Sequence, residues 1–369
     1  MEETIFLKKS NNIIKRGNLN YLGFHKFFGM YLIIRMHLYD NKNMPFDFGI
    51  RMCELLFVSS GFLVGYNYYK KPIEYNYISS IKYAYKHLRL FYPYYLFNLF
   101  YGLYLYREKI NLDLTCLELL LINILLIANW SSHRKVARFY FGISWFLDNI
   151  FYCYFLSNFF LSSINDFKNS LKLFVFATLS RILSEELLNR GAYNVFDTNF
   201  HCGPIIRILE FYMGMLIIPL FFKLKIFLDK FKNSVIFQIF FSVIQILSPL
   251  LLYYIMVEYQ NIFLRCYFVL IICVYIFIIS FDFGFLSVLV SLKIFKIIMS
   301  TQLEMYLIQF NVHLTLEIYF RINKSGKFYG LFIYYIKLCV IFSVSYLYRR
   351  FLRDKLAILK EYLFLSSRK

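Results

Sequence analysis

The sequence is poor in charged residues and in the residues that break helices. Its 369 residues include only 6 Pro and 14 Gly, and only 17% are Asp, Glu, Lys or Arg. Soluble domains carry about 25% charged residues, whereas collagen-like and disordered chains are far richer in Pro and Gly. The composition therefore excludes collagen and disorder, and it argues against a water-soluble fold.

Cysteine pairs with a recognisable spacing are also missing. The seven cysteines are scattered, none forms a CxxC pair, and none has metal-like spacing to a histidine. Most of them lie inside apolar runs, where Cys behaves as a small hydrophobic residue. The sequence therefore predicts neither a structural disulfide nor a metal site.

Apolar and basic residues are abundant instead. Hydrophobic residues make up 60% of the chain, including 45 Phe and 34 Tyr, and the net charge is +19. The basic residues fall in short gaps between apolar runs. This placement predicts positively charged loops beside a membrane and contact with lipid headgroups, and it does not favour nucleic-acid binding.

Ten apolar stretches have the length of a membrane span. They lie at roughly 21–38, 47–69, 91–107, 141–163, 169–188, 205–223, 233–256, 262–280, 302–320 and 329–349. With ten spans, the side that holds both termini carries more than twice as many Lys and Arg residues as the other side, which makes it cytoplasmic. An eleventh stretch, 114–130, would move basic segments outside if it crossed, so we interpret it as an interfacial or re-entrant helix on the outer face.

The sequence therefore predicts an all-α polytopic membrane protein, a bundle of about ten transmembrane helices in the inner (plasma) membrane. We divide the chain into a cytoplasmic segment 1–20, a transmembrane domain 21–350 and a basic cytoplasmic tail 351–369.

The first span holds an unusual pair of basic residues, Lys26 and His37. They are 11 residues apart, which is three helical turns plus about 20°, so they share one stripe and lie about 16 Å apart along the axis. Charged residues in a span are costly and mark function or internal pairing. His37 is interpreted either as a catalytic base or as a satisfied interfacial histidine. Arg35 points nearly the opposite way, and headgroup contact explains it as well as function does.

Further polar residues fall in the outer halves of four other spans, and we interpret them as the lining of a hydrated cavity open to the outside. They are Glu54, Trp145, Asp148, Arg181, Glu185, Glu186, Arg207 and Glu210. Arg207 and Glu210 are spaced i, i+3, so they are alternatively predicted to pair with each other. On the cytoplasmic side, Lys86 and Arg89 form either an ordinary basic flank or a phosphate clamp.

Six sequence blocks in a fixed order resemble the acyltransferase-3 family of integral membrane acyltransferases. They cover about residues 20–350 and read HKFFGMYLIIRMH, ELLFVSSGFLVGYNYYKK, KHLRLFYPYY, ISWFL, RILEFYMGM and LEMYLIQFNV. Each block alone is weak. An SGFL block that follows a first helix with a basic-x10-His motif is fairly specific, and all six blocks in order make the resemblance strong.

The resemblance implies a ten-helix enzyme that moves an acyl group, commonly acetyl, from acyl-CoA to a hydroxyl of a cell-surface carbohydrate such as a polysaccharide or lipopolysaccharide. It assigns Lys26 and His37 to the catalytic basic-x10-His motif. It assigns Lys86 and Arg89 to a basic-x-x-basic motif that would bind acyl-CoA. Ser60, in the SGF segment, and Trp145, in the fourth span, complete the predicted acyl-CoA-binding residues.

Two positions depart from the family pattern. Lys26 stands where Arg is more usual, which keeps the charge but loses the planar guanidinium fork. Gln309 stands where family members often carry His, which removes a titratable group. Glu54, Arg207 and Gln309 are predicted to bind or orient the acceptor.

The implied chemistry needs a base for the acceptor hydroxyl and donors for the oxyanion. His37 fits the base, and Lys26 would stabilise the CoA anion; the acyl group passes to the acceptor either directly or by way of His37. The expected partners are membrane lipids, acyl-CoA and a carbohydrate acceptor, with no bound cofactor and no metal.

Two other classes of protein remain open. A transporter or flippase would favour Gly/Pro-broken spans in two corresponding halves, and neither feature is evident. A polymerase of lipid-linked saccharides would need no cytoplasmic phosphate clamp.

Overall fold

The computed structural model describes nine stretches of the chain. They are residues 19–38, 47–70, 77–88, 91–105, 114–128, 144–189, 203–258, 262–320 and 327–353. Every regular element within these stretches is a helix, so the predicted all-α class is confirmed. Segments 1–18 and 354–369, and with them most of the predicted N-terminal segment and basic tail, lie outside the described residues.

The helices follow one another along the chain with short connections. The first half contains α2 (Asn20–Leu38), α3 (Asp47–Lys70), α4 (Tyr77–Leu88), α5 (Tyr92–Leu105), α6 (Leu114–Ile124), α8 (Ser144–Phe160), η3 (Leu161–Ile164) and α9 (Phe167–Asn189). The second half contains α11 (Pro204–Leu216), α12 (Ile218–Leu228), α13 (Val235–Glu258), α14 (Ile262–Ile279), α15 (Phe285–Val290), α16 (Lys293–Ser300), α17 (Gln302–Phe320), α18 (Lys327–Tyr348) and η4 (Arg349–Arg353).

Each of the ten apolar stretches corresponds to a helix in the structure. The agreement is within a few residues at most ends, for example α2 for 21–38 and α17 for 302–320. Three stretches are both long and apolar enough to cross a membrane, namely Pro204–Leu228, Val235–Met256 and Phe332–Phe351. The first of these is mostly buried in the protein, whereas the other two are mostly exposed, as expected of helices that face lipid.

The stretch 114–130 does not form one long helix. Its helix, α6, has 11 residues, which is about 16 Å of helix against a hydrocarbon core of about 30 Å. The chain then turns through Leu126, which has a positive φ of 57°. Two tyrosines of α5 close this end, because Tyr92 and Tyr95 donate hydrogen bonds to the carbonyls of Ile124 and Asn123 at 2.6 and 3.0 Å. Alone, α6 is too short to span a bilayer.

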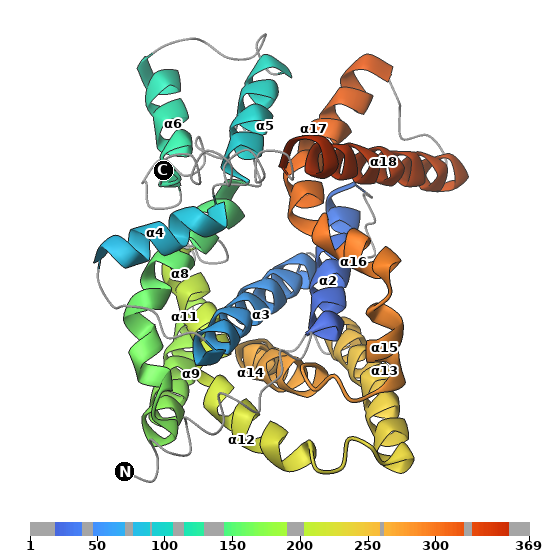
Figure 1. Cartoon of the computed structure of the whole chain (residues 1–369). Coiled ribbons are helices and arrows are strands. Elements are labelled where there is room, and N and C mark those ends of the chain that lie inside the picture. Colours follow the sequence, from blue (N-terminus) through green and yellow to red (C-terminus); the bar gives the residue numbers. More distant parts are fainter. Residues whose placement is uncertain are drawn as a thin grey trace, which may run out of the picture.

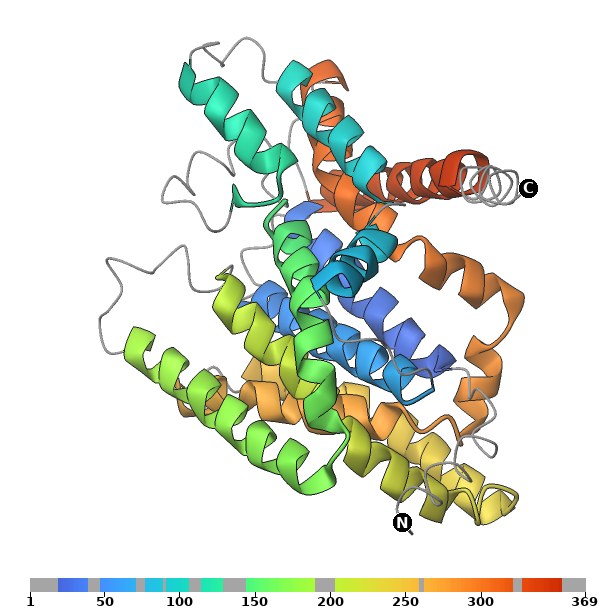
Figure 2. The ribbon, with the colours of Figure 1, turned by 60° about the vertical axis from the view of Figure 1, so that its left-hand side comes forward.

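Helix α3 lies at the centre of the molecule, with α2 beside it (Figures 1 and 2). It packs most extensively against α11, at a crossing where glycines bring the two backbones together. A Cβ atom on Gly61 would lie 1.7 Å from the carbonyl oxygen of Phe211, and one on Gly214 would lie 2.0 Å from that of Val58. Small residues permit such close approach between helices in membranes.

The N-terminus of α2 is held by the loop that follows α14. The carboxylate of Asp282 accepts a hydrogen bond from the backbone N–H of Asn20 at 3.3 Å. A carboxylate at this position also complements the positive end of the helix dipole. Burial raises the pKa of Asp282 to about 7, because the charged form is less well solvated there.

The glycine crossing generates a stability prediction. We expect Gly61→Ala to destabilise the protein by about 1–3 kcal/mol or more, because the new methyl group meets backbone and not a flexible side chain. The matched control is Gly23→Ala on α2, where a Cβ would meet only the sulfur of Met299 at 3.4 Å. Thermal unfolding of both variants in detergent would check this. An unchanged unfolding temperature for Gly61→Ala would contradict the backbone contact.

Candidate functional site

The candidate site is a cavity of about 190 Å³ at the junction of α2, α3, α8 and α17. Its polar lining includes an amine from α2, a hydroxyl from α3 and a carboxylate from α17, namely Lys26, Ser60 and Glu304. The remaining lining residues are Met30, Leu56, Phe91, Phe146, Ile150, Tyr154, Met299, Ser300, Gln302 and Leu303. The cavity therefore combines one basic, one acidic and several hydroxyl groups inside a largely apolar wall.

The amine of Lys26 lies against the hydroxyl of Ser60. The distance from Nζ to Oγ is 3.0 Å, and the Ser60 residue is only 6% exposed. Close packing of α2 on α3 brings the two together: Gly29 of α2 leaves so little room that a Cβ there would lie 3.1 Å from Leu55. On α3, the neighbouring Gly61 faces α11, so Ser60 projects from a helix whose other side is fixed.

The acidic member of the cavity, Glu304, is fully buried in the first turn of α17. Sequence analysis did not select it, although a carboxylate within an apolar stretch is a usable signal. Its position on the same cavity as Lys26 gives the site one positive and one negative group.

The basic flank of the third span lies next to this cavity in the sequence. Phe91 contributes to the cavity wall and follows Arg89 by two positions. Arg89 itself lies outside the described residues. Lys86 is exposed on α4, an amphipathic helix that packs against α8.

His37, the other member of the basic-x10-His motif, does not line the cavity. It is exposed in the last turn of α2, about 16 Å along the helix from Lys26, and it interacts electrostatically with His313 of α17. The Nδ1 atom of His313 lies 2.6 Å from the Nζ atom of Lys337 on α18. Sequence analysis missed both partners. His313 is one turn beyond Gln309, and Lys337 interrupts an apolar span, which is a signal that could have been used.

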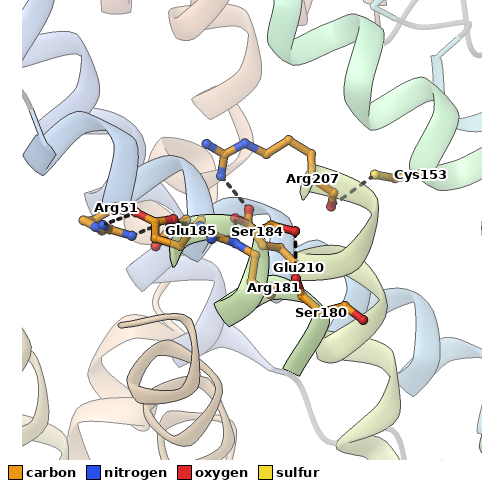
Figure 3. Close-up of polar contacts among 9 residues, drawn as sticks. Arg51, Cys153, Ser180, Arg181, Ser184, Glu185, Arg207 and Glu210 are labelled. Atoms are coloured by element: carbon orange, nitrogen blue, oxygen red, sulfur yellow. Dashed lines mark hydrogen bonds and ion pairs between the residues drawn. The ribbon is translucent and has the colours of Figure 1, made fainter. Parts of the chain in front are cut away.

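A second polar feature is a buried ion-pair network between α3, α9 and α11 (Figure 3). Each of the three helices contributes one arginine and one glutamate, so the network has no net charge. Its members are Arg51 and Glu54 of α3, Arg181 and Glu185 of α9, and Arg207 and Glu210 of α11.

Arg181 is the centre of this ion-pair network. Its guanidinium nitrogens contact Glu54 at 2.8 Å, Glu185 at 2.5 Å and Glu210 at 3.0 Å. Arg51 contacts Glu54 at 2.6 Å and Glu185 at 3.3 Å. All of these side chains are at most 7% exposed. One arginine thus joins carboxylates from all three helices.

At the other end of the network, Arg207 pairs with Glu210 at 2.5 Å, so the predicted i, i+3 pairing is confirmed. The Cζ atom of Arg207 also lies 5.5 Å from the ring centre of Phe57 and 5.8 Å from that of Trp145. Trp145 therefore packs against the network, and it is not among the residues that line the cavity.

The prediction of a hydrated cavity lined by these charges is wrong for the network residues. Opposite charges from three helices neutralise one another inside the protein, where an unpaired charge would be costly. Asp148 is also fully buried, and Glu186 is partly buried. The roles predicted for Glu54 and Arg207 toward an acceptor stay predictions, with both groups engaged in ion pairs.

Gln309 is buried in α17 with 1% exposure, and neither its amide nitrogen nor its amide oxygen has a hydrogen-bond partner among the described residues. It does not line the cavity. Its predicted contact with an acceptor also stays a prediction.

The part of the chain that the structure describes contains no group of three or more His, Cys, Asp or Glu side chains that could hold a metal ion. No protein-family model, no curated protein and no solved structure matches the chain.

The network generates a second stability prediction. Arg181→Met leaves three buried carboxylates without their shared partner, and loss of one member of a buried pair costs about 3–5 kcal/mol. We expect this variant to unfold at a much lower temperature than the wild type or to fail to fold. The control is Lys172→Met, the same change at an exposed position of α9. Equal thermal unfolding of the two variants in detergent would contradict a stabilising role for Arg181.

Proposed function

We propose that the chain is a membrane O-acyltransferase of the acyltransferase-3 type, which moves an acetyl or other short acyl group from acyl-CoA to a hydroxyl of a cell-surface carbohydrate. The proposal includes ten transmembrane helices with both termini in the cytoplasm of the cell and the protein in its inner membrane. Ten helices at the expected positions, and an α6 too short to cross, support this topology.

The single observation that carries the proposal is the contact between Lys26 and Ser60 on one cavity. The two residues belong to different sequence blocks of the resemblance, and the first helix and the SGFL block have no local reason to place these atoms together. Their meeting at a cavity, beside a buried carboxylate, is what a site for a polar reaction requires.

The place of the basic flank supports acyl-CoA as the donor. The chain leads from Lys86 and Arg89 directly to Phe91 in the cavity wall. Phosphates bound by these basic residues at the cytoplasmic surface would leave the acyl end of the molecule free to enter the cavity. Arginine and lysine both suit phosphate, through a bidentate fork and a point charge respectively.

In this scheme the cavity and His37 serve different parts of the reaction. About 16 Å of helix separates Lys26 from His37, so the two side chains do not act on the same atom. The acyl group is held near Lys26 and Ser60, and His37, with His313 and Lys337 nearby, meets the acceptor at the other end of α2.

The function is tested by labelling. Membranes that contain the protein should transfer radiolabel from [acetyl-¹⁴C]acetyl-CoA to carbohydrate, and membranes with Lys26→Met should not. Lys172→Met serves as the control at an exposed site. Correctly inserted wild-type protein that labels no carbohydrate would refute the acyltransferase and favour a transporter or a polymerase of lipid-linked saccharides.

The phosphate clamp is tested by kinetics. We expect Arg89→Gln to raise the KM for acetyl-CoA about 10- to 150-fold, which corresponds to a lost charge-assisted hydrogen bond of about 1.5–3 kcal/mol. The KM for the acceptor should change little. The control is Lys82→Gln, an exposed lysine on α4 one turn before Lys86. If Arg89→Gln inserts normally and keeps the wild-type KM, the residue only sets the topology.

A further inference from the structure

Two adjacent serines on α3 have different surroundings. The hydroxyl of Ser59 donates a hydrogen bond to the carbonyl of Leu56 at 3.1 Å, within its own helix. The hydroxyl of Ser60 lies 3.0 Å from Nζ of Lys26 and on the cavity. Of the two, Ser60 is thus the serine that is both reachable from the cavity and in contact with a basic group.

We propose that Ser60 is a covalent acyl carrier and that Lys26 is its general base. The inference rests on the proposed acyltransferase function and deepens it. A serine with a lysine in hydrogen-bond contact is a known alternative to a serine with a histidine in nucleophilic catalysis. The resemblance assigned neither the nucleophile nor the base to these two residues.

The first half-reaction takes the acyl group from the thioester. The Oγ atom of Ser60 attacks the thioester carbonyl carbon while its proton passes to the neutral amine of Lys26. The carbon–sulfur bond then breaks, and the CoA thiolate takes that proton and leaves as the thiol. The product is an ester on Ser60 with Lys26 neutral again, so no oxidant or reductant is needed.

The second half-reaction passes the acyl group on. The acceptor hydroxyl attacks the ester carbon and gives its proton to Lys26, and the carbon–oxygen bond to Ser60 breaks. The serine oxygen recovers the proton from Lys26. The chain returns to its starting state, and the acceptor carries the acyl group as an ester.

Distance decides in favour of Lys26 as the base. General bases act at about 2.6–3.2 Å, and Nζ of Lys26 is already 3.0 Å from the hydroxyl. His37 begins about 16 Å away along α2. The ammonium that forms for a moment on Lys26 has the carboxyl group of Glu304 on the same cavity to offset its charge.

The size of the cavity fits a carrier of small acyl groups. Pockets that hold a whole drug-sized ligand are about 300–1,000 Å³, whereas this cavity has about 190 Å³. It has room for an acetyl thioester end but not for the nucleotide. The nucleotide must therefore stay outside, as the position of the basic flank also requires.

Isotope exchange tests the carrier without requiring the ester to accumulate. Purified full-length protein in lipid nanodiscs is incubated with acetyl-CoA and [³H]CoA in the absence of any carbohydrate. A covalent carrier catalyses exchange of label into acetyl-CoA, because the first half-reaction runs in both directions. We expect exchange by the wild type and by the control Ser59→Ala, and a loss of at least about a thousandfold in Ser60→Ala.

A second variant tests the base separately from its charge. Lys26→Arg keeps a cation and hydrogen-bond donors, but an arginine does not give up its proton at neutral pH. We expect exchange to fall by about 10²- to 10⁴-fold. Exchange at the wild-type rate in Lys26→Arg would overturn the base, and exchange at the wild-type rate in Ser60→Ala would overturn the carrier.

The labelling experiment separates this inference from the proposed function. Carbohydrate labelling without any CoA exchange would leave the acyltransferase in place and overturn the carrier, because transfer would then be direct. Exchange that depends on Ser60 without carbohydrate labelling would support the carrier and refute the proposed acceptor. Absence of both would overturn both.

Discussion

The need to neutralise charge inside an apolar protein governs the centre of this structure. Arg181 is 2% exposed, and three carboxylates surround it. A guanidinium in such a place is tolerable only when carboxylates approach it closely, and those carboxylates come from three different helices. The positions of α3, α9 and α11 are therefore linked, because a shift of any one helix would leave a buried charge without its partner.

The glycine crossing makes this arrangement possible, and the site depends on both. Because Gly61 and Gly214 allow the backbones of α3 and α11 to touch, the network residues on these helices come within ion-pair distance. The same crossing fixes α3 from one side. Ser60 follows directly in the sequence and projects toward α2, where it meets Lys26. The polar contact on the cavity is thus supported by packing on the opposite side of the helix.

Much of the fold could be predicted from the sequence, because a long apolar stretch has few alternatives to a helix. The ten stretches all correspond to helices, and the Arg207–Glu210 pair could be predicted because it is local in the sequence. The crossing of a membrane by all ten stays a prediction.

The contacts between distant helices could not be predicted from spacing. Arg181 meets Glu54 across 127 positions, so the charges looked like the lining of a water-filled cavity when each was considered in its own span. Lys26 was rightly paired with His37 on one helical stripe, but its actual neighbour is Ser60 on another helix. His313 and Lys337 were missed for the same reason, because their contact exists only when α17 and α18 pack together.

The composition of the ion-pair network has a consequence for the biosynthesis of the protein. Each helix carries its own arginine and glutamate three or four residues apart, on a single turn. Each helix therefore enters the lipid as an electrically balanced unit, before its partners have been synthesised. The contacts between helices, such as Arg181 with Glu54, form later by adding to these local pairs. Exchanging an arginine on one helix with a glutamate on another would preserve the total charge, yet it would oblige two helices to insert with an uncompensated pair of like charges.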